Sequence, residues 1–365
     1  MSPPDLLSPL VYRNGVQAKN RVLLAPMTNQ QSHADGTLSD DEQHWLDMRA
    51  RGGFGTIETC ASHVALDGQG WSGEMGIFDD RLLPGLTRLA TGLREAGARS
   101  LVQIFHGGVR APSEVTGLQP WSASAFHEDK PGFEVPRAAT EADITRVIEQ
   151  FRDAAVRAHR AGFDGVELHG AHGYLFGQFL SRTMNQREDG WGGSFENRAR
   201  LLRETLRAVR AAVPASFVVG VRISPEDRNQ ARGLDLDESL QLARWLVDDG
   251  TDFLHLSLWK AQQPSLKRPS EFTVPQFRAI VPPEVPIIVA GEIWTRAEAD
   301  EQLARGADAV AIGRAAIANP AWAARVADPS WQPDRPPFTV AELQARGLNE
   351  TFANYMRRWP GFVRD

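Results

Sequence analysis

Eight short apolar segments recur along the chain, and stretches with helical periodicity separate them. Most of these segments are nearly continuous in Val, Ile, Leu or Phe, which is typical of parallel strands covered on both faces. They span residues 22–27, 55–61, 101–106, 165–171, 218–224, 252–258, 286–291 and 309–314. Eight alternations favour a closed barrel over an open doubly wound sheet. No G-x-G-x-x-G motif follows the first segment, which argues against a dinucleotide-binding Rossmann fold. The sequence therefore predicts an α/β protein, a single (β/α)8 TIM barrel.

Helix start and stop signals support this alternation. Residues 144–161 carry apolar side chains at close to 3.6-residue spacing, directly after a capping-box pattern between Thr140 and Asp143. Gly162 follows as a C-terminal stop signal. Further helices are expected at 197–213, 236–249 and 296–305, and the last two precede Gly250 and Gly306.

Three segments lie outside the repeated unit. Residues 12–16 form a tight hairpin with Asn14-Gly15 at its tip, which we place as a plug at one end of the barrel. The long connection 107–140 after the third strand is rich in Pro, Gly and Ser, and loops of this length are usually functional. A C-terminal tail begins at about Asp328. We expect residues 1–365 to form one domain.

Composition and charge exclude several classes of partner. The net charge is −6 over 365 residues, with a pI near 5.9, which offers no electrostatic footprint for nucleic acid or an anionic membrane. Cys60 is the only cysteine, so neither an internal disulfide nor a multi-cysteine metal site can form within one chain. No signal peptide pattern opens the sequence and no apolar run could span a bilayer, so we expect a cytoplasmic protein.

Functional side chains of a barrel of this type lie at the carboxyl ends of the strands. The fourth strand ends in His169-Gly-Ala-His172-Gly-Tyr174, where the turning chain lets two imidazoles converge. The two histidines could ligate a metal, bind a substrate oxygen, or simply be satisfied structural residues. Tyr174, one of three tyrosines, could act as a general acid or only pack.

Other strand ends offer groups for binding an anion. Arg222, at the end of an apolar strand, needs either an internal carboxylate or an anionic cofactor ring. Gly291, Gly313 and Arg314 follow strands seven and eight, where this fold often binds phosphate, although glycines can also merely end strands.

Several motifs together resemble the Old Yellow Enzyme family of FMN-dependent NAD(P)H oxidoreductases, over nearly the whole chain. They are NRVLLAPMT at 20–28, VQIFHGG at 102–108, PWSAS at 120–124, AGFDGVELHGAHGY at 161–174, NQREDGWGGSFENR at 185–198, VAIGR at 310–314, and Asn319-Pro320. Their order on eight strands makes the resemblance specific.

The resemblance implies an FMN site. Pro26, Met27 and Thr28 would lie along the flavin ring, with the Thr28 hydroxyl near O4, and Thr59 would contribute a backbone contact. Gln103 would pair with the pyrimidine edge and Arg222 would lie beside N1 and O2. The phosphate-binding residues would be Gly291, Gly313 and Arg314.

The same resemblance implies an ene-reductase with a ping-pong mechanism. NADH or NADPH would reduce FMN, and hydride would then pass from the flavin to the β-carbon of an α,β-unsaturated carbonyl or nitro compound. His169 and His172 would bind the substrate oxygen and Tyr174 would donate the proton. The partners expected are small-molecule substrates and further copies of this chain in a homo-oligomer. In that oligomer Arg357 or Arg358 would enter the active site of a neighbouring subunit; the alternative is that these arginines are solvated on the tail.

This chain departs from the family pattern at several positions. Thr28 stands where many relatives with a His-x-x-His motif have cysteine, residues 29–32 lack an aromatic side chain, and Trp259 is bulkier than expected after the sixth strand. The cysteine cluster and second domain of the dienoyl-CoA reductase relatives are absent, which predicts a one-domain enzyme without an iron–sulfur centre.

Alternative functions remain at this stage. A flavin-dependent dehydrogenase or demethylase could use the same scaffold, and a silent FMN-binding protein is a further reading. A metal-dependent barrel hydrolase or isomerase, using His169, His172 and a carboxylate such as Glu167, is the hypothesis from a different class.

Overall fold

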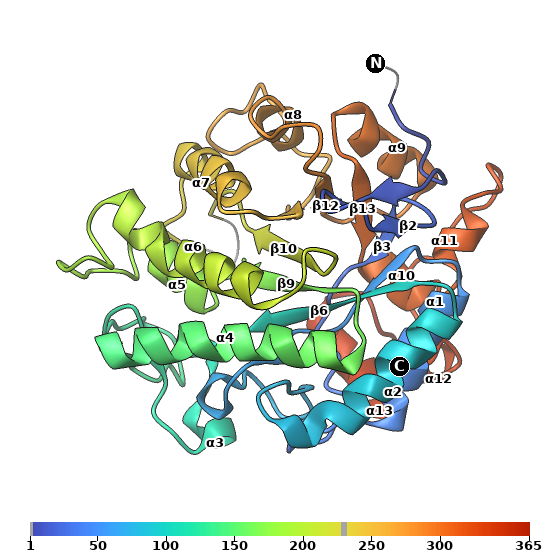
Figure 1. Cartoon of the computed structure of the whole chain (residues 1–365). Helices are drawn as coiled ribbons and strands as arrows, with labels where there is room; N and C mark the ends of the chain where they lie inside the picture. Colours follow the sequence, from blue (N-terminus) through green and yellow to red (C-terminus); the bar gives the residue numbers. More distant parts are fainter. Residues whose placement is uncertain (1–2, 228–231) are drawn as a thin grey trace.

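All eight predicted strands form, and they close into one parallel barrel (Figure 1). The computed structural model describes residues 3–227 and 232–365. The barrel strands are β3 (Val22–Leu24), β4 (Thr56–Glu58), β6 (Arg99–Phe105), β9 (Gly165–Gly170), β10 (Val218–Ile223), β11 (Phe253–Ser257), β12 (Ile287–Ala290) and β13 (Ala309–Ile312). The barrel closes where β13 pairs with β3, with Val310 opposite Val22. A short additional strand, β5 (Ser62–His63), pairs with the carboxyl end of β6. The predicted (β/α)8 fold is confirmed.

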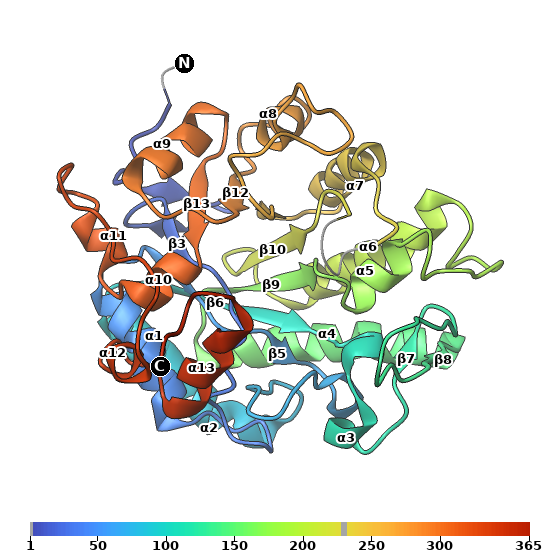
Figure 2. The ribbon, with the colours of Figure 1, turned by 180° about the vertical axis from the view of Figure 1, so that it is seen from behind.

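Helices cover the outside of the barrel between successive strands (Figures 1 and 2). They are α1 (Asp40–Arg51), α2 (Leu83–Glu95), α4 (Glu141–Ala161), α6 (Phe195–Ala212), α7 (Leu236–Asp248), α8 (Thr273–Arg278), α9 (Arg296–Ala304) and α10 (Arg314–Ala318). A short helix, α5 (Leu175–Leu180), precedes α6 after β9. The expected capping box opens α4, since the Thr140 side chain accepts from the Asp143 N–H and the Asp143 side chain accepts from the Thr140 N–H. Gly162 ends the helix at φ +91°, as its sequence signal predicts.

The N-terminal hairpin seals the amino end of the barrel. Strands β1 (Leu10–Val11) and β2 (Gln17–Ala18) pair antiparallel, and the Tyr12 N–H donates to the Val16 carbonyl at 2.9 Å. Tyr12 packs inside the barrel with Phe253, and its hydroxyl lies 2.9 Å from the Thr56 Oγ1. The predicted plug therefore leaves only the carboxyl end of the barrel open for a site.

The connection 107–140 carries little regular structure. It contains η3 (Gly108–Arg110), α3 (Ser113–Thr116) and the paired strands β7 (Trp121–Ser122) and β8 (Arg137–Ala138). The tail contains α11 (Trp322–Arg325), α12 (Val340–Gln344), α13 (Glu350–Tyr355) and η4 (Met356–Arg358). Within the described residues, no helix combines the length and the apolar character that crossing a bilayer requires.

Gly220 gives a test of the barrel interior. A Cβ at this position would lie 2.1 Å from ring atoms of Phe253, its register partner on β11. We expect Gly220→Ala to lower the free energy of unfolding by about 1–3 kcal/mol through overpacking, measured by urea denaturation. Phe253→Leu should recover part of this loss in the double variant, because the smaller side chain makes room. If the changes in the free energy of unfolding of the two single variants simply add in the double variant, this packing is contradicted.

Candidate active site

A deep cavity of about 290 Å³ opens at the carboxyl ends of the strands. All of the predicted site residues except Thr59 line it. Those present are Pro26, Met27, Thr28, Gln103, His169, His172, Tyr174, Arg222, Gly291, Gly313 and Arg314. They come from six of the eight strands or the turns that follow them, so the closed barrel alone brings them together.

Thr59 lies outside this cavity. Its N–H donates to the Leu101 carbonyl at 3.0 Å and its hydroxyl donates to the Cys60 carbonyl at 2.8 Å. Ala61, two residues further along, lines the cavity instead. Strand β4 ends one residue before Thr59, so the chain is still buried in the barrel wall at that point and turns toward the cavity only at Ala61.

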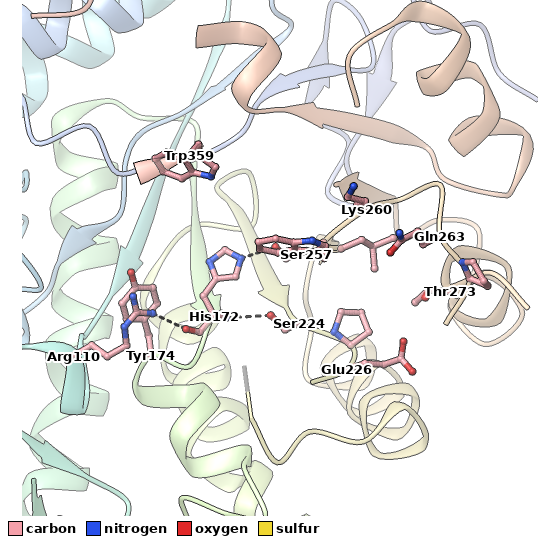
Figure 3. Close-up of a pocket in the computed structure, with 14 residues that line it drawn as sticks. Arg110, His172, Tyr174, Ser224, Glu226, Ser257, Lys260, Gln263, Thr273 and Trp359 are labelled. Atoms are coloured by element: carbon pink, nitrogen blue, oxygen red, sulfur yellow. Dashed lines mark hydrogen bonds between the residues drawn. The ribbon is translucent and has the colours of Figure 1, made fainter. Parts of the chain in front are cut away.

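The two histidines after β9 do converge. Their ring centroids lie 5.0 Å apart, and His172 adopts φ +60°, the left-handed turn that swings its side chain back toward His169. The Ala171 N–H donates to His169 Nδ1, which leaves the proton of a neutral His169 ring on Nε2. His172 Nε2 lies 2.6 Å from the Ser257 Oγ (Figure 3).

Burial sets the charge state of both imidazoles. It lowers the pKa of His169 and of His172 well below the ordinary value, and neighbouring positive charge, including Arg222, lowers it further. Both rings are therefore neutral at physiological pH, and each can donate one hydrogen bond to an oxygen in the cavity.

Tyr174 lies against the same wall, with its ring 4.9 Å from that of His169 and 5.0 Å from that of Phe105. Burial raises the pKa of its phenol, and the positive charge of Arg110 partly opposes this shift. The phenol keeps its proton at neutral pH and is available as an acid.

Arg222 projects from β10 into the cavity and is 5% exposed. Its Nη2 donates to the Ser257 Oγ at 3.0 Å, while its Nε has no hydrogen-bond partner within the described chain. Such an unpaired buried N–H indicates a missing acceptor.

A buried cluster of ionisable groups lies near Arg222 inside the barrel. Glu167 accepts from the Gln103 Nε2 at 2.7 Å and pairs with the His255 Nδ1 at 2.7 Å. Glu58 lies 3.7 Å from the same His255 nitrogen, and both of its oxygens lack hydrogen-bond partners among the described residues. Two carboxyl groups this close and fully buried do not both ionise easily.

The proposed metal site of His169, His172 and Glu167 is not formed. Glu167 faces Gln103 and His255 within the barrel instead of joining the two histidines. In the described chain, the one set of three residues with metal-ligand geometry is Glu58, Glu167 and His255. Side chains alternate between the two faces of β9, so Glu167 and His169 lie on the same face. Glu167 comes two residues earlier along the strand and therefore lies deeper in the barrel than His169.

The opposite end of the cavity is lined by groups suited to an anion. A Cβ on Gly291 would meet the Ala261 nitrogen at 2.8 Å, and Gly313 caps the N-terminus of α10. Arg314 lies 3.1 Å from Glu292, which also pairs with Lys260 at 3.2 Å. Glu292 has φ +55°, a left-handed conformation directly after Gly291.

Several cavity residues were not anticipated from the sequence. Ser257 links His172 to Arg222, and Trp71 stacks on Phe105. Trp259, by contrast, stands out in the sequence for its bulk; it is 52% exposed and lines the cavity. Tyr355 and Trp359 reach the cavity from the tail.

The two tail arginines make contacts within this chain. Arg357 pairs with Asp365 at 2.9 Å, and the Arg358 guanidinium lies 5.2 Å from the Tyr355 ring centroid. Their entry into a neighbouring subunit's site stays a prediction. No spacing in the tail sequence indicates that Tyr355 and Trp359 reach the cavity.

Comparisons with known proteins agree with this geometry. The model of the NADH:flavin oxidoreductase / NADH oxidase family matches residues 5–330. The probable NADH-dependent flavin oxidoreductase YqiG of Bacillus subtilis is 35% identical over 327 residues, covering 88% of this chain and 87% of YqiG. The NADH:fumarate oxidoreductase of Klebsiella pneumoniae is 36% identical over 332 residues, and the chain spans only 36% of that longer protein.

Solved structures show the same barrel. The old yellow enzyme homologue from Zymomonas mobilis superposes with a TM-score of 0.83 at 26% identity, covering 96% of this chain and 99% of that one. Morphinone reductase superposes with a TM-score of 0.79 at 28% identity, with 94% and 93% covered.

Glu58 gives a pH-dependent prediction. Burial first, and then the neighbouring Glu167, raises its pKa well above the ordinary value, and Arg222 opposes the shift. The folded state thus binds a proton that the unfolded state releases, so this group's contribution to stability falls as pH rises above its unfolded pKa. We expect the Tm of Glu58→Gln to fall less than that of the wild type between pH 5 and pH 9.

Glu167→Gln is the matched control, since it removes the carboxylate that Gln103 and His255 bind and should destabilise across this range. A Glu58→Gln protein that loses more stability at pH 9 than at pH 5 would show that Glu58 is a stabilising anion.

Proposed function

The chain belongs to the NADH:flavin oxidoreductase / NADH oxidase family, whose members use FMN with NADH or NADPH, and on this premise we propose that it is an ene-reductase. The substrates proposed are alkenes activated by a conjugated carbonyl or nitro group. The observation that carries the proposal is the convergence of two neutral imidazoles and one protonated phenol on a single cavity.

The cavity fits FMN on two observations. The unpaired Arg222 Nε lacks an acceptor, which a flavin ring nitrogen or oxygen would supply. At the other end, Gly291, Gly313 and Arg314 line the cavity, and the phosphate would bind beside them. Pro26, Met27 and Thr28 would then line the ring.

FMN, when bound, supplies the redox chemistry by accepting two electrons from NADH or NADPH and returning them to the alkene as a hydride. Arg222 would stabilise the negative charge that reduction places on the ring. Gln103, held at 2.7 Å by Glu167, would present its amide in one fixed orientation to the ring edge.

His169 and His172 would bind the oxygen of the activating group. Hydrogen bonds from neutral imidazoles polarise the alkene, and they strengthen as charge develops on that oxygen. The Ser257 hydroxyl, shared between His172 and Arg222, orients the second imidazole. Tyr174 would complete the reaction by giving its phenolic proton to the α-carbon.

Names of relatives are consistent with this substrate class. Two are an NADH:fumarate and an NADH:acrylate oxidoreductase, and fumarate and acrylate are alkenes conjugated to a carboxylate. The aromatic walls made by Trp71, Trp259 and Trp359 suit planar substrates.

The proposal is tested by following flavin absorbance in the FMN-loaded protein under anaerobic conditions. NADH or NADPH should bleach the flavin band, and 2-cyclohexenone, a maleimide or a nitroalkene should restore it, with the saturated compound as product. A flavin that is reduced by a saturated substrate, and is not reoxidised by any alkene of this panel, would indicate the dehydrogenase or demethylase alternative instead.

Tyr174→Phe should slow alkene-dependent reoxidation by about 100-fold or more, because the proton donor is lost. The rate of flavin reduction by NADH or NADPH should stay near that of the wild type. Stopped-flow measurement of the two half-reactions separates these effects. Equal slowing of both half-reactions would exclude Tyr174 as the specific proton donor.

Arg314→Ala should weaken FMN binding by about 10- to 100-fold, the loss expected for charge-assisted hydrogen bonds to a phosphate. Quenching of FMN fluorescence during titration of the apoprotein measures the Kd. Riboflavin, which lacks the phosphate, should bind both proteins with similar affinity. Arg244→Ala, on the exposed face of α7, is the matched control; an FMN affinity unchanged in Arg314→Ala would contradict the assignment.

A further inference from the structure

Arg110 contacts two of the proposed catalytic residues and no acid. It ends η3, directly after β6, and lines an outer cavity of about 300 Å³ together with His172 and Tyr174. Its Nη1 donates to the His172 carbonyl at 2.7 Å, and its guanidinium carbon lies 4.2 Å from the centroid of the Tyr174 ring (Figure 3). The guanidinium thus joins the backbone of one catalytic residue to the ring of the other.

The other basic residues at the cavities have different surroundings. Arg314 and Lys260 share the carboxylate of Glu292, and Arg222 lies near Glu58 and Glu167. Arg110 forms no ion pair with any carboxylate of the described chain, although it is only half-exposed. Its charge is therefore not neutralised locally and acts on the groups it touches.

The turn that carries Arg110 is held firmly. Gly108 has φ +61°, and a Cβ there would lie 2.2 Å from the Gln178 Oε1, so only glycine fits. The Gly108 N–H donates to His106 Nδ1 at 3.0 Å and the Val109 N–H donates to Gln178 at 3.1 Å. The sequence His106-Gly-Gly-Val-Arg110 thus fixes the backbone from which the Arg110 side chain reaches over the Tyr174 ring.

We propose that Arg110 is a positioning residue for proton transfer, which clamps the Tyr174 ring against the His172 backbone and stabilises the phenolate formed when Tyr174 gives up its proton. This inference rests on the proposed function, in which Tyr174 is the proton donor. In that step the Tyr174 O–H bond breaks, and the electron pair of the enolate or nitronate left by hydride addition to the substrate forms the new C–H bond at the α-carbon. The electron pair of the O–H bond stays on the phenolate oxygen, which later takes a proton from solvent.

Among the charged groups around Tyr174, Arg110 is the cation with the largest effect on the pKa of the phenol. From the loop after β5, Glu74 raises the phenol's pKa; from the tail, Tyr355 raises it and Arg358 lowers it. Arg222 on β10 also interacts with the phenol, and His169 beside it is neutral. Among the causes that lower the pKa of Tyr174, the Arg110 charge is the largest. Its removal should therefore make Tyr174 a weaker acid.

The chain's three tyrosines permit a direct measurement. Biosynthetic labelling with a ring-fluorinated tyrosine makes each phenol more acidic and gives one ¹⁹F NMR signal each for Tyr12, Tyr174 and Tyr355. Tyr174→Phe identifies the Tyr174 signal by its disappearance. The pH titration of that signal in the FMN-loaded protein then reports the phenol's protonation without any turnover.

Arg110→Met and Arg110→Gln should raise the titration midpoint of Tyr174 by about 1–2 pH units, as expected for the loss of a partly buried charge within 5 Å. Both should slow alkene-dependent flavin reoxidation by about tenfold. Arg110→Lys keeps the charge and should recover most of the midpoint while recovering less of the rate, because it cannot reproduce the planar contact. Arg244→Met, a surface charge removal on α7, should change neither.

A Tyr174 midpoint in Arg110→Gln and Arg110→Met equal to that of the wild type would overturn the proposal. So would a loss confined to the KM of carboxylate-bearing alkenes, which would make Arg110 an anchor for a substrate anion. Failure of the proposed function gives a different result from failure of this inference. If Tyr174 is not the proton donor, the flavin of Tyr174→Phe is reoxidised by the alkene at the wild-type rate, while the Tyr174 titration midpoint still changes in the Arg110 variants.

Discussion

The parallel pairing of β13 with β3 is the contact on which the site depends. It closes the sheet, and closure places the turn after β3 next to the turn after β13. Without it, Thr28 and Arg314 would stand at opposite edges of an open sheet. The hairpin plug at the amino end, where Tyr12 fills the barrel, leaves the strand-end residues a single open face. One cavity therefore receives side chains that are almost 300 residues apart in the chain.

Inside the barrel, protonation of a buried carboxyl group limits the charge as much as ion pairing does. Arg222 is a buried cation that interacts with Glu58 and Glu167, and burial, followed by the charge of Glu167, raises the pKa of Glu58 well above its ordinary value. Arg222 itself lines the cavity, and its buried Nε has no hydrogen-bond partner among the described residues. This arrangement suits a ligand ring that becomes more negative on reduction, because the compensating charge is already in place.

The fold was predictable from local patterns, whereas parts of the site were not. Apolar runs and glycine stops mark strands and helices within a few residues, as the capping box of Thr140 and Asp143 illustrates. The convergence of His169 and His172 also follows from a strand end, although the φ of +60° at His172 that produces it has no signature of its own. Family motifs located the remaining strand-end residues because they mark positions on the barrel.

The features of the site that the sequence does not indicate have a common physical origin in contacts between distant segments. Thr59 and Ala61 differ by two residues, and only the point where β4 leaves the barrel wall decides which reaches the cavity. The cluster of Glu58, Glu167 and His255 joins three strands, and no spacing in the sequence indicates it. Trp359 reaches the cavity from the tail after a path along the outside of the barrel, which periodicity cannot trace.

The cavities also bear on the order of events in catalysis. The deep and outer cavities share His172, Tyr174, Ser257, Leu258, Trp259 and Trp359 as lining residues, so these side chains form a wall common to both. Under the proposed function, a nicotinamide and an alkene that both need the same flavin face would occupy this wall in turn. Two ligands that exclude each other at one surface require the reductant to leave before the alkene binds. For the ene-reductase that we propose, a shared wall of His172 and Tyr174 would favour a ping-pong sequence.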